Sequence, residues 1–564
     1  MLSFKNIQTR DELAFLLRMP IKKLTHLLYI KKPENSYIQF EIPKRSGGVR
    51  QICAPDDDLK VIQKVLANKL LSHRNEYWKE RGITPNISHA FEPKKGIITN
   101  AYIHRNKRFV LNIDLKDFFD SIHFGRVQGY FQKNENWMFS YEAATVIAQL
   151  CCYQGKLPQG APTSPIISNL ICEILDFRLL QIAKRHMADY TRYADDLTFS
   201  SNDKNFLINF KKFYDSINRQ IVSSGFAINE KKTRLQYRDS RQSVTGLIVN
   251  KKINVNHNYY KQTRAMAMSL YRNGEFYING ELGSIEQLEG RFAFINQLDK
   301  FNNKRGPIYK NPCNYLNGRE RQYQQFLFYK YFFAHSKPII VTEGKTDIIY
   351  LKAALMNRCE EYPSLVQRCS DGTFEFKVAF LRRSKRLWYF FDLCIDGADS
   401  LSKIFEFYTG TNGKPNYYHK FKDLSQQEPV YPVILMFDNE LQLQKGDSPI
   451  KKFIKTCGLG EEFKQELSRQ CYGKTQSEGK LYVITHKLVD NAKKCEIEDL
   501  FDEATRSHKI DGKSLSLSDS YDREKYYGKD AFSKFVYANY EKINFDKFGP
   551  TLDALAKIVE ESTI

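Results

Sequence analysis

The sequence predicts a multidomain protein that combines α/β and α+β architecture. The chain has 564 residues, and at about 150 residues per domain this length corresponds to two to four domains. Hydrophobic residues make up 42% of it, which is enough for sizeable cores. Strand and helix patterns are mixed in the first 250 residues, whereas they alternate regularly after residue 338, and such alternation is typical of a parallel sheet.

The first 250 residues contain the predicted elements of an α+β region. Residues 38–55 alternate as two strands around the turn Ser46-Gly47-Gly48. Apolar residues at helical spacing follow over 57–78. Further helices are predicted over 141–152, 165–187 and about 204–224, and further strands over 109–114, 232–237 and 243–250.

The rest of the chain is predicted to change from helices to an α/β pattern. Helices with basic faces cover 259–272, 284–303 and 319–333. A boundary is expected near 330–337, because a strand over 338–344 and a helix over 346–355 begin a new pattern. Two more strands are predicted, within 430–440 and over 481–485.

The charge balance indicates a polyanionic partner. Lys and Arg number 86 against 65 Asp and Glu, a net charge of +21, and phosphate contacts release condensed counterions. Aromatic residues, 14% of the chain, offer stacking faces to unpaired bases. No apolar run approaches the roughly 18 residues of a membrane span, and no signal-peptide core is seen. We expect a cytoplasmic protein with no membrane partner, whose 11 cysteines are reduced and bind no metal.

The stretch RYADDLTFS, residues 192–200, places Asp195 beside Asp196 between two β-prone runs. Neighbouring carboxylates raise each other's pKa because like charges repel, and a divalent cation offsets that repulsion. Asp114, which ends the strand over 109–114, can converge with them at one sheet edge. Such oxygen ligands suit Mg²⁺, with Mn²⁺ as a second candidate, and two ions about 4 Å apart clamp the oxygens of a phosphoryl transfer. Spacing alone is equally compatible with a solvated Asp-Asp turn.

Five ordered motifs resemble those of reverse transcriptases. YADD at 193–196 resembles their YxDD motif, and NIDLKDFFDSI, LPQGAPTSPIISNL, GFAINEKKT and VTGLIVN resemble the others. NAYIH at 100–104 and VTG at 244–246 resemble the NAxxH and VTG elements of retron reverse transcriptases. The resemblance covers about residues 30–330. It implies a right-hand fingers-palm-thumb polymerase that copies part of a structured noncoding RNA from a 2′-hydroxyl, using deoxynucleotide triphosphates, to give branched RNA–DNA (msDNA). An intron-type or other bacterial reverse transcriptase is the alternative.

The resemblance also implies roles for individual residues. The catalytic metal ligands would be Asp114, Asp195 and Asp196. Phe119 matches the family's steric-gate position, where an aromatic ring excludes a ribose 2′-OH. The alternative is that Phe119 only packs in the core. Lys232 would protonate the departing pyrophosphate, unless it is only a solvated lysine. The backbone carbonyl of Leu115 would be a further metal ligand. Gln159 and Gly160 would line the nucleotide pocket, and Arg50 would contact the triphosphate, with Lys44 as a helper.

The basic helices after residue 250 fit a thumb that grips an A-form hybrid through its backbone, although such faces are often only solvated. Asn100 and His104 of the NAxxH element either contact RNA or are structural. The sequence leaves both alternatives open, and we carry the RNA contact forward as a prediction.

A second set of acids follows the predicted strands of the α/β region. Glu343 lies at a strand end and Asp347 one helical turn later, so both can face one ion. Asp438 and Glu440 share a face if their strand continues. Acids at the ends of successive elements predict a second Mg²⁺ site. The third element contributes Glu498 and Asp499.

This second pattern resembles the TOPRIM domain of topoisomerases, primases and overcoming-lysogenization-defect nucleases, with Gly397 at the family's middle glycine. The sequence Asp438-Asn439-Glu440 departs from the family's Asp-x-Asp and lengthens one ligand arm. No tyrosine has the context of a strand-passage nucleophile, so a nuclease is favoured over a topoisomerase. The resemblance implies a Mg²⁺ site in which Glu343, Asp438 and Glu440 are catalytic, with Asp347 and Asp499 as further metal ligands.

A retron reverse transcriptase fused to such a domain resembles antiphage systems in which the RNA–DNA product restrains a toxic effector. The alternative is a C-terminal module that only binds or packages that product. Bound nucleic acid can also bridge several copies of the chain. The expected division is fingers and palm at 1–245, thumb at 246–335, a TOPRIM-like domain at 336–505 and a C-terminal helical extension at 506–564.

Overall fold

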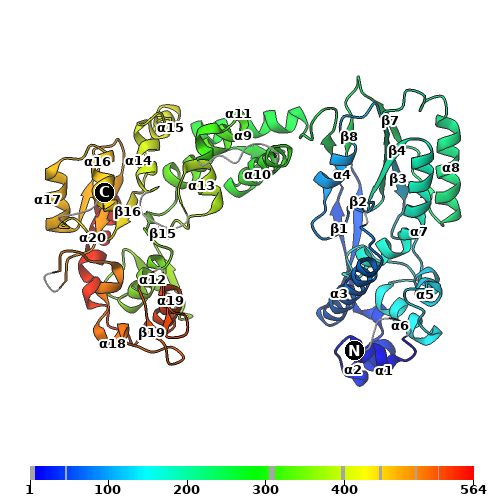
Figure 1. Ribbon diagram of the computed structural model, residues 1–564, viewed down its shortest axis with the longest axis horizontal. Helices are drawn as coiled ribbons and strands as arrows, with labels where there is room; N and C mark the ends of the chain where they lie inside the picture. The colour runs from blue at the N-terminus through cyan, green and yellow to red at the C-terminus, as the bar shows by residue number, and fades with distance from the viewer. Residues whose placement is uncertain are drawn as a thin grey trace. The chain divides into compact units, whose positions relative to one another are not determined.

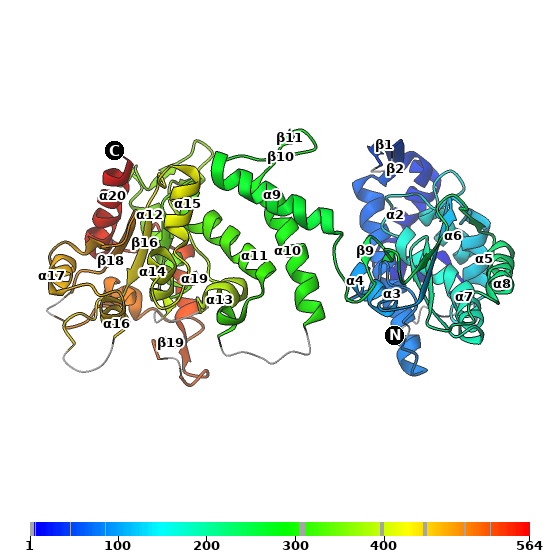
Figure 2. The same cartoon turned by 90° about the horizontal axis from the view of Figure 1, so that it is seen from above.

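A computed structural model of the protein forms two compact units, Met1–His257 and Asn258–Ile564, which are described separately (Figures 1 and 2). Within the described ranges, every helix is too short or too polar to cross a membrane. The structure describes the whole chain except residues 1–4, 6, 45–46, 85, 304–310, 395–399, 444–447, 490–491, 519 and 564, and the side chain of residue 563.

The predicted hairpin of the first unit is present as β1 (Tyr37–Pro43) and β2 (Val49–Pro55), which pair antiparallel with Phe40 opposite Ile52. Ser46 of the expected turn lies outside the described residues. Gly47 has a φ of +89°, a conformation that favours glycine. The preceding elements are α1 (Arg10–Leu16), α2 (Ile21–Thr25), the π-helix η1 (His26–Lys31) and the 3-10 helix η2 (Pro33–Ser36).

The centre of the first unit is a sheet of strand order β4-β5-β3-β6, with β7 also paired to β3. Its middle strand β3 (Phe109–Lys116) is almost wholly buried. The hairpin β4 (Ala188–Tyr193) and β5 (Asp196–Ser201) lies against it. The other strands of this unit are β6 (Ala227–Ile228), β7 (Arg234–Tyr237), β8 (Ser243–Val244) and β9 (Leu247–Ile248).

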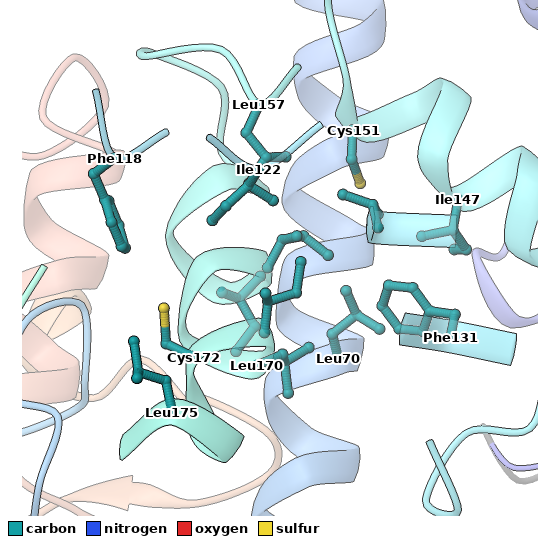
Figure 3. Packing of buried hydrophobic residues seen from close by; sticks show 14 of the residues in the cluster. Leu70, Phe118, Ile122, Phe131, Ile147, Cys151, Leu157, Leu170, Cys172 and Leu175 are labelled. Atoms are coloured by element: carbon teal, nitrogen blue, oxygen red, sulfur yellow. The ribbon is translucent and has the colours of Figure 1, made fainter. Parts of the chain in front are cut away.

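Helices bury the apolar side chains of this unit into one core. The long helix α7 (Ser164–Arg185) is buried along much of its length, and Figure 3 shows its Leu170 beside Leu70 of a neighbouring helix and its Cys172 beside Leu175. The predicted helix at 204–224 begins later, at Phe210, because residues 203–209 form turns. The other helices are α3 (Asp57–Glu80), α4 (Ile97–Ile103), α5 (Phe124–Lys133), α6 (Tyr141–Cys151) and α8 (Phe210–Ser223).

The second unit begins with helices and continues into the predicted parallel sheet. Its five strands follow the order β15-β12-β16-β18-β17. Strand β12 pairs parallel with β15 and β16, and β16 pairs parallel with β18, whereas β17 is antiparallel. The strands are β12 (Ile339–Val341), β15 (Ala379–Phe380), β16 (Val433–Phe437), β17 (Tyr472–Lys474) and β18 (Leu481–Thr485).

Both faces of this sheet are covered, because alternate residues of its central strand enter different cores. Val433, Leu435 and Phe437 pack in one apolar cluster, whereas Ile434 and Met436 pack in the other. The first cluster includes residues of α9 (His257–Asn273), α10 (Ile285–Asn302), α11 (Gly318–Phe328), the π-helix η4 (Tyr329–Phe333), α13 (Lys385–Phe391), α14 (Ser402–Thr409), α15 (Tyr417–Ser425), α16 (Pro449–Thr456) and α17 (Glu461–Gln470). The second includes residues of α12 (Asp347–Asn357), α19 (Lys529–Ala538) and α20 (Gly549–Thr563).

Shorter elements complete the second unit. Two hairpins are formed by β10 (Tyr277–Ile278) with β11 (Glu281–Leu282) and by β13 (Val366–Arg368) with β14 (Phe374–Phe376), and β19 (Ser514–Leu515) pairs parallel with β20 (Tyr526–Tyr527). The short helices are η3 (Pro312–Tyr315), η6 (Ile497–Leu500), α18 (Glu503–Arg506) and η7 (Asp546–Phe548).

The compact division falls after His257 and not near residues 330–337, where a boundary was expected. Aromatic side chains explain this difference, because Phe328 of α11 contacts the rings of Tyr408, Tyr417 and Phe421. The basic helices assigned to a thumb therefore share a core with the α/β sheet that follows them. The four-part division of the chain stays a prediction.

Candidate active sites

Three carboxylates meet where β3 ends and the β4–β5 hairpin turns. Strand pairing places Asp114 opposite Asp196, and the N–H of Leu115 donates to the carbonyl of Asp195 at 2.9 Å. Ala194, within the turn, has a φ of +56°, which is uncommon for residues other than glycine. The backbone thus brings the predicted residues Asp114, Asp195 and Asp196 to one edge of the sheet.

The charges of these acids oppose one another. Burial and the neighbouring Asp114 raise the pKa of Asp195, while Lys232 and Arg50 lower it. Burial and repulsion from Asp195 and Asp114 raise the pKa of Asp196 to about 7, although this residue also keeps surface open to solvent. A group of carboxylates that resist ionisation together is stabilised by a bound cation.

Both carboxylate oxygens of Asp114 already have donors from the turn after β6. Lys232 Nζ lies 2.9 Å from Oδ1, and Asn229 Nδ2 donates to Oδ2 at 3.0 Å. Within the described residues, no three Asp, Glu, His or Cys side chains are close enough together to hold a metal ion. The chemistry of these ligands nevertheless fits Mg²⁺, because carboxylates supply the hard oxygen atoms that this ion prefers. The Lys232 ammonium group occupies one of these oxygens, Asp114 Oδ1, as a positive charge would.

A cleft of about 1080 Å³ opens over these acids, and most of the predicted nucleotide contacts line it. The hairpin β1–β2 contributes Arg50 and Lys44, and the strand β3 contributes Leu115. Phe119 also lines it, and its ring contacts the buried Phe118 edge-on at 5.2 Å. The cleft lining further includes Gln159 and Lys232.

Gly160 shapes the cleft and is not among its lining residues. Its φ is +122°, and a Cβ atom there would lie 2.8 Å from the carbonyl oxygen of Cys53. The neighbouring carbonyl of Gln159 accepts from the N–H of Cys53 at 2.7 Å. Glycine thus permits the close approach that joins this loop to β2.

Asn100 and His104 are completely buried, so the prediction that they contact RNA is not supported by their positions. His104 Nδ1 bonds with Ser200 Oγ and its Nε2 with Thr191 Oγ1, both at 2.7 Å, and Thr191 donates to Asn100 Oδ1 at 2.6 Å. Burial lowers the pKa of His104 to about 3, so the ring is neutral. These residues connect α4 to the central hairpin, which is the structural alternative.

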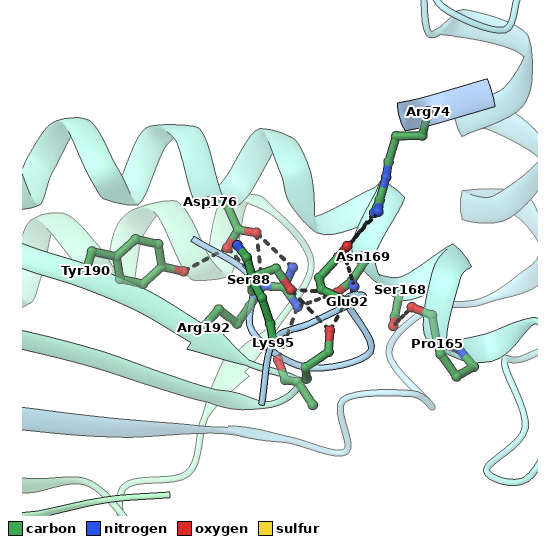
Figure 4. Close-up of polar contacts among 12 residues, drawn as sticks. Arg74, Ser88, Glu92, Lys95, Pro165, Ser168, Asn169, Asp176, Tyr190 and Arg192 are labelled. Atoms are coloured by element: carbon green, nitrogen blue, oxygen red, sulfur yellow. Dashed lines mark hydrogen bonds and ion pairs between the residues drawn. The ribbon is translucent and has the colours of Figure 1, made fainter. Parts of the chain in front are cut away.

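A buried polar network behind the turn between β4 and β5 could not be predicted from the sequence (Figure 4). Arg192 has no exposed surface, and its guanidinium donates to both oxygens of Asp176 at 2.8 to 3.0 Å. Its Nη1 also donates to Asn169 Oδ1 at 3.2 Å and lies 3.4 Å from the carbonyl oxygen of Ala194. Arginine within RYADD was the available signal, but sequence cannot show that its partner lies 16 residues earlier.

Asp176→Leu should destabilise the first unit by about 3–5 kcal/mol, because it leaves the buried Arg192 charge without its counter-ion. The midpoint of urea unfolding, followed by a probe in this unit, measures the effect. The double variant Asp176→Leu, Arg192→Met should recover most of the loss, since it removes both charges. If the single variant lowers the free energy of unfolding by less than about 1 kcal/mol, the ion pair of Asp176 and Arg192 contributes no more than a solvent-exposed salt bridge does.

In the second unit, acids gather beyond the carboxyl ends of β12 and β16. Glu343 Oε1 accepts from the N–H of Asp438 at 3.1 Å, and Asp347 Oδ2 accepts from the N–H of Gly344 at 2.7 Å. The N–H of Ile497 donates to Asp438 Oδ1 at 3.1 Å. Three elements that are distant in sequence are thereby joined at one sheet edge, where ligands of parallel α/β sheets bind.

Burial and mutual repulsion raise the pKa values of these acids. The pKa of Glu343 is raised to about 8, by burial first and then by Asp347 and Glu440. Burial and repulsion from Glu343 and Asp347 raise the pKa of Asp438 well above its usual range. Glu440 also has a raised pKa, mainly through burial, which the nearby Lys494 opposes. The donor set of this site therefore also suits a cation.

The two acids predicted for the third element, Glu498 and Asp499, have different surroundings in the structure. Asp499 Oδ2 accepts from the N–H of Glu496 at 3.0 Å and its Oδ1 lies 3.3 Å from Arg506, so Asp499 caps a 3-10 helix. Glu498 is buried and instead repels Asp438. Lys529 Nζ, from the C-terminal region, lies 3.1 Å from Glu498 and 3.4 Å from Glu496. Gly397 lies outside the described residues.

Comparison with known proteins connects the first unit to polymerases. A family model described as reverse transcriptase (RNA-dependent DNA polymerase) matches residues 42–255. The retron Ec86 reverse transcriptase of Escherichia coli is 33% identical over 307 residues, which cover 53% of this chain and 89% of that protein. The retron Mx65 reverse transcriptase of Myxococcus xanthus is 32% identical over 312 residues, covering 52% and 69%.

Among solved structures, telomerase from Candida albicans in complex with a fragment of telomeric RNA aligns with 58% of this chain and 64% of that chain, at 13% identity and a TM-score of 0.30. The family-model match ends before Asn258, so it concerns the first unit alone.

Proposed function

The chain belongs to the retron reverse transcriptases, and we propose from this membership and from the acidic cleft that it copies part of a structured noncoding RNA into DNA. The product would be msDNA, in which the DNA is joined to a 2′-hydroxyl of the RNA. The observation that carries the proposal is the register of β3 and β5, which sets Asp114 against Asp196 in the unit matched by the polymerase family.

Asp114, Asp195 and Asp196 would hold the Mg²⁺ ions, with the Leu115 carbonyl as a further oxygen ligand. Bound Mg²⁺ lowers the pKa of the attacking hydroxyl and neutralises charge on the triphosphate. Arg50, which lines the cleft, would bind phosphate oxygens through its guanidinium fork. Lys232 is already at the acids, where it can hold a proton near the leaving pyrophosphate. Gln159 would line the nucleotide pocket, and Gly160 would keep the pocket's loop against β2.

Nucleic acid that copurifies with the chain tests this function directly. Sequencing of its RNA and DNA parts should reveal one RNA that carries DNA complementary to part of itself, joined at an internal 2′-hydroxyl. The same preparation from an Asp114→Asn variant should contain the RNA without the DNA. DNA-free RNA bound to the active wild-type chain would contradict the retron reaction.

Phe119→Val should reduce discrimination against ribonucleotides by about 10- to 200-fold, the range expected when a steric contact in a substrate pocket is changed. The ratio of kcat/KM for deoxynucleotides to that for ribonucleotides measures the effect. Phe131→Leu is the matched control, because the Phe131 ring is fully buried in the core and its loss should lower stability without changing selectivity. Unchanged discrimination in an active Phe119→Val enzyme would assign Phe119 to packing alone.

For the second unit, we propose a TOPRIM-like, Mg²⁺-dependent nuclease built on Glu343, Asp438 and Glu440. The support is the convergence of acids at the carboxyl edge of a parallel sheet and the raised pKa of Glu343. Asp347 and Glu498 would be further ligands, and Lys529 would balance their charge when no ion is bound. By resemblance to fused retrons, this activity would defend against phage while msDNA restrains it.

A non-catalytic module that binds msDNA is the alternative for this unit, and metal binding separates the two. Calorimetric titration of Mg²⁺ into the full chain carrying Asp195→Asn and Asp196→Asn would report on the second site. If the heat of Mg²⁺ binding to this chain disappears when Glu343→Gln is added, the result supports the nuclease. Absence of saturable Mg²⁺ binding before that change supports the packaging role.

A further inference from the structure

Asn229 contacts Asp114 twice, through its backbone and through its side chain. Its N–H donates to the carbonyl oxygen of Asp114 at 2.8 Å, and its Nδ2 donates to Asp114 Oδ2 at 3.0 Å. The residue follows β6, which pairs with β3 directly beyond the acid, and it lines the cleft. An amide that holds a carboxylate in this way restricts both its position and its rotation.

The turn that contains Asn229 closes without using its amide side chain. The carbonyl of Asn229 accepts from the N–H of Lys232 at 3.0 Å and from the N–H of Thr233 at 3.1 Å. Thr233 Oγ1 donates to the same carbonyl at 3.1 Å. Because these bonds use only the backbone of Asn229, its side chain is left for Asp114.

The same turn returns Lys232 to the other oxygen of that carboxylate, so the two oxygens have unlike partners. Oδ2 bonds with a neutral amide on a short side chain, whereas Oδ1 bonds at 2.9 Å with an ammonium group whose side chain is 59% exposed. An exposed ammonium on a flexible side chain can leave toward solvent, and a divalent cation competes with it for the same oxygen. The amide donor has no charge that a cation would displace.

We propose that Asn229 is a positioning residue that fixes Asp114 Oδ2, so that Asp114 offers only Oδ1 to a divalent cation, and that Lys232 holds Oδ1 until the cation binds. This inference rests on the proposed metal site of the polymerase. It assigns opposite effects to two neighbouring residues: Asn229 favours metal binding, and Lys232 competes with it.

Binding of Mn²⁺ alone to the full chain, measured by electron paramagnetic resonance without nucleotide, tests this arrangement. All variants carry Glu343→Gln and Asp438→Asn, so that the second acidic cluster does not contribute. Asn229→Ala should raise the apparent Kd by about 10- to 100-fold, the range found when the partner of a metal ligand is removed. Lys232→Ala should lower the apparent Kd, because the competing ammonium is gone.

Asn112→Ala is the matched control for a structural effect. Asn112 lies on β3 two residues before Asp114, and its amide donates to the Ser243 carbonyl at 2.9 Å and accepts from Thr198 at 3.1 Å. Its loss should lower the unfolding midpoint and leave the Kd for Mn²⁺ unchanged. A purely structural role for Asn229 predicts this same behaviour for Asn229→Ala.

Wild-type affinity in Asn229→Ala, or weaker binding in Lys232→Ala, would overturn the inference. Asp195→Asn with Asp196→Asn separates this failure from failure of the proposed function. If that pair abolishes Mn²⁺ binding while Asn229→Ala does not, the metal site stands and only the role of Asn229 falls. If neither change affects binding, the metal site itself is wrong.

Discussion

Asp196→Asn in the full chain should lower the rate of DNA synthesis on the cognate RNA by at least about 1000-fold. The carboxylate is one of the few oxygen ligands available to Mg²⁺ at the junction of β3 and β5. Losing the ion's stabilisation of the transition state costs several kcal/mol, and about 4 kcal/mol corresponds to this factor. Extension of labelled primer, with purified RNA and saturating deoxynucleotides, measures the rate.

Asp189→Asn is the control for this experiment, because Asp189 lies on the same hairpin but pairs with Lys107 at 2.5 Å. That variant should keep nearly full activity. Circular dichroism and binding of the RNA should be normal for both variants. Near wild-type synthesis by Asp196→Asn would contradict the assignment of this acid to catalysis.

Glu343→Gln should lower the proposed nuclease activity of the second unit by a similar factor while leaving DNA synthesis intact. Its carboxylate lies among Asp347, Asp438 and Glu440, and its pKa is raised to about 8 by burial and by repulsion from Asp347 and Glu440. The amide keeps the size of the side chain but loses the charge that would bind Mg²⁺. Cleavage of nucleic acid by the purified chain and growth of cells expressing it are the two measurements.

If msDNA restrains the second unit, a chain carrying Asp196→Asn should slow growth, and adding Glu343→Gln should restore it. Glu461→Gln is the control for the added change, since Glu461 lies on the exposed start of α17 and forms an ion pair with the nearby Lys464. Toxicity that persists with Glu343→Gln would contradict a nuclease at this site. Unimpaired growth with Asp196→Asn would contradict restraint by msDNA.

The arrangement of the polymerase acids could be predicted from sequence because it depends on local pattern. Asp114 lies near the end of the buried strand β3 and Asp195 in the turn between β4 and β5, and antiparallel pairing of β3 with β5 accounts for their proximity. The parallel sheet of the second unit was predictable for the same reason, since its strands are short apolar runs followed by acids or turns. Regular periodicity carries this kind of information well.

Residues whose role depends on a distant partner could not be assigned in that way. His104 lies in a motif that suggested a contact with RNA, but its two ring nitrogens form hydrogen bonds with Thr191 and Ser200 of the central hairpin. Which of the neighbours Glu498 and Asp499 lies near Asp438 depends on the orientation of one 3-10 helical turn. Lys529 approaches these acids from α19, and nothing in its local sequence indicates that fold contact.

The compact division falls after His257 and not near residues 330–337 for a related physical reason. Two different periodic patterns meet near residues 330–337, which suggested a domain boundary, but the aromatic residues on both sides pack into one cluster. Ring contacts such as those of Phe328 with Tyr408 and Phe421 are set by tertiary structure. Sequence patterns predict which side chains are buried, but they do not predict which residues those side chains contact.

A structure of the full chain with its RNA, Mg²⁺ and a non-hydrolysable deoxynucleotide would test the central claim most directly. The account predicts ion density about 2.1 Å from oxygens of Asp114, Asp195 and Asp196, with Lys232 moved away from Asp114 and the triphosphate beside Arg50. A nucleotide bound elsewhere, with Lys232 and Asn229 still occupying both oxygens of Asp114 and no ion between the acids, would contradict it.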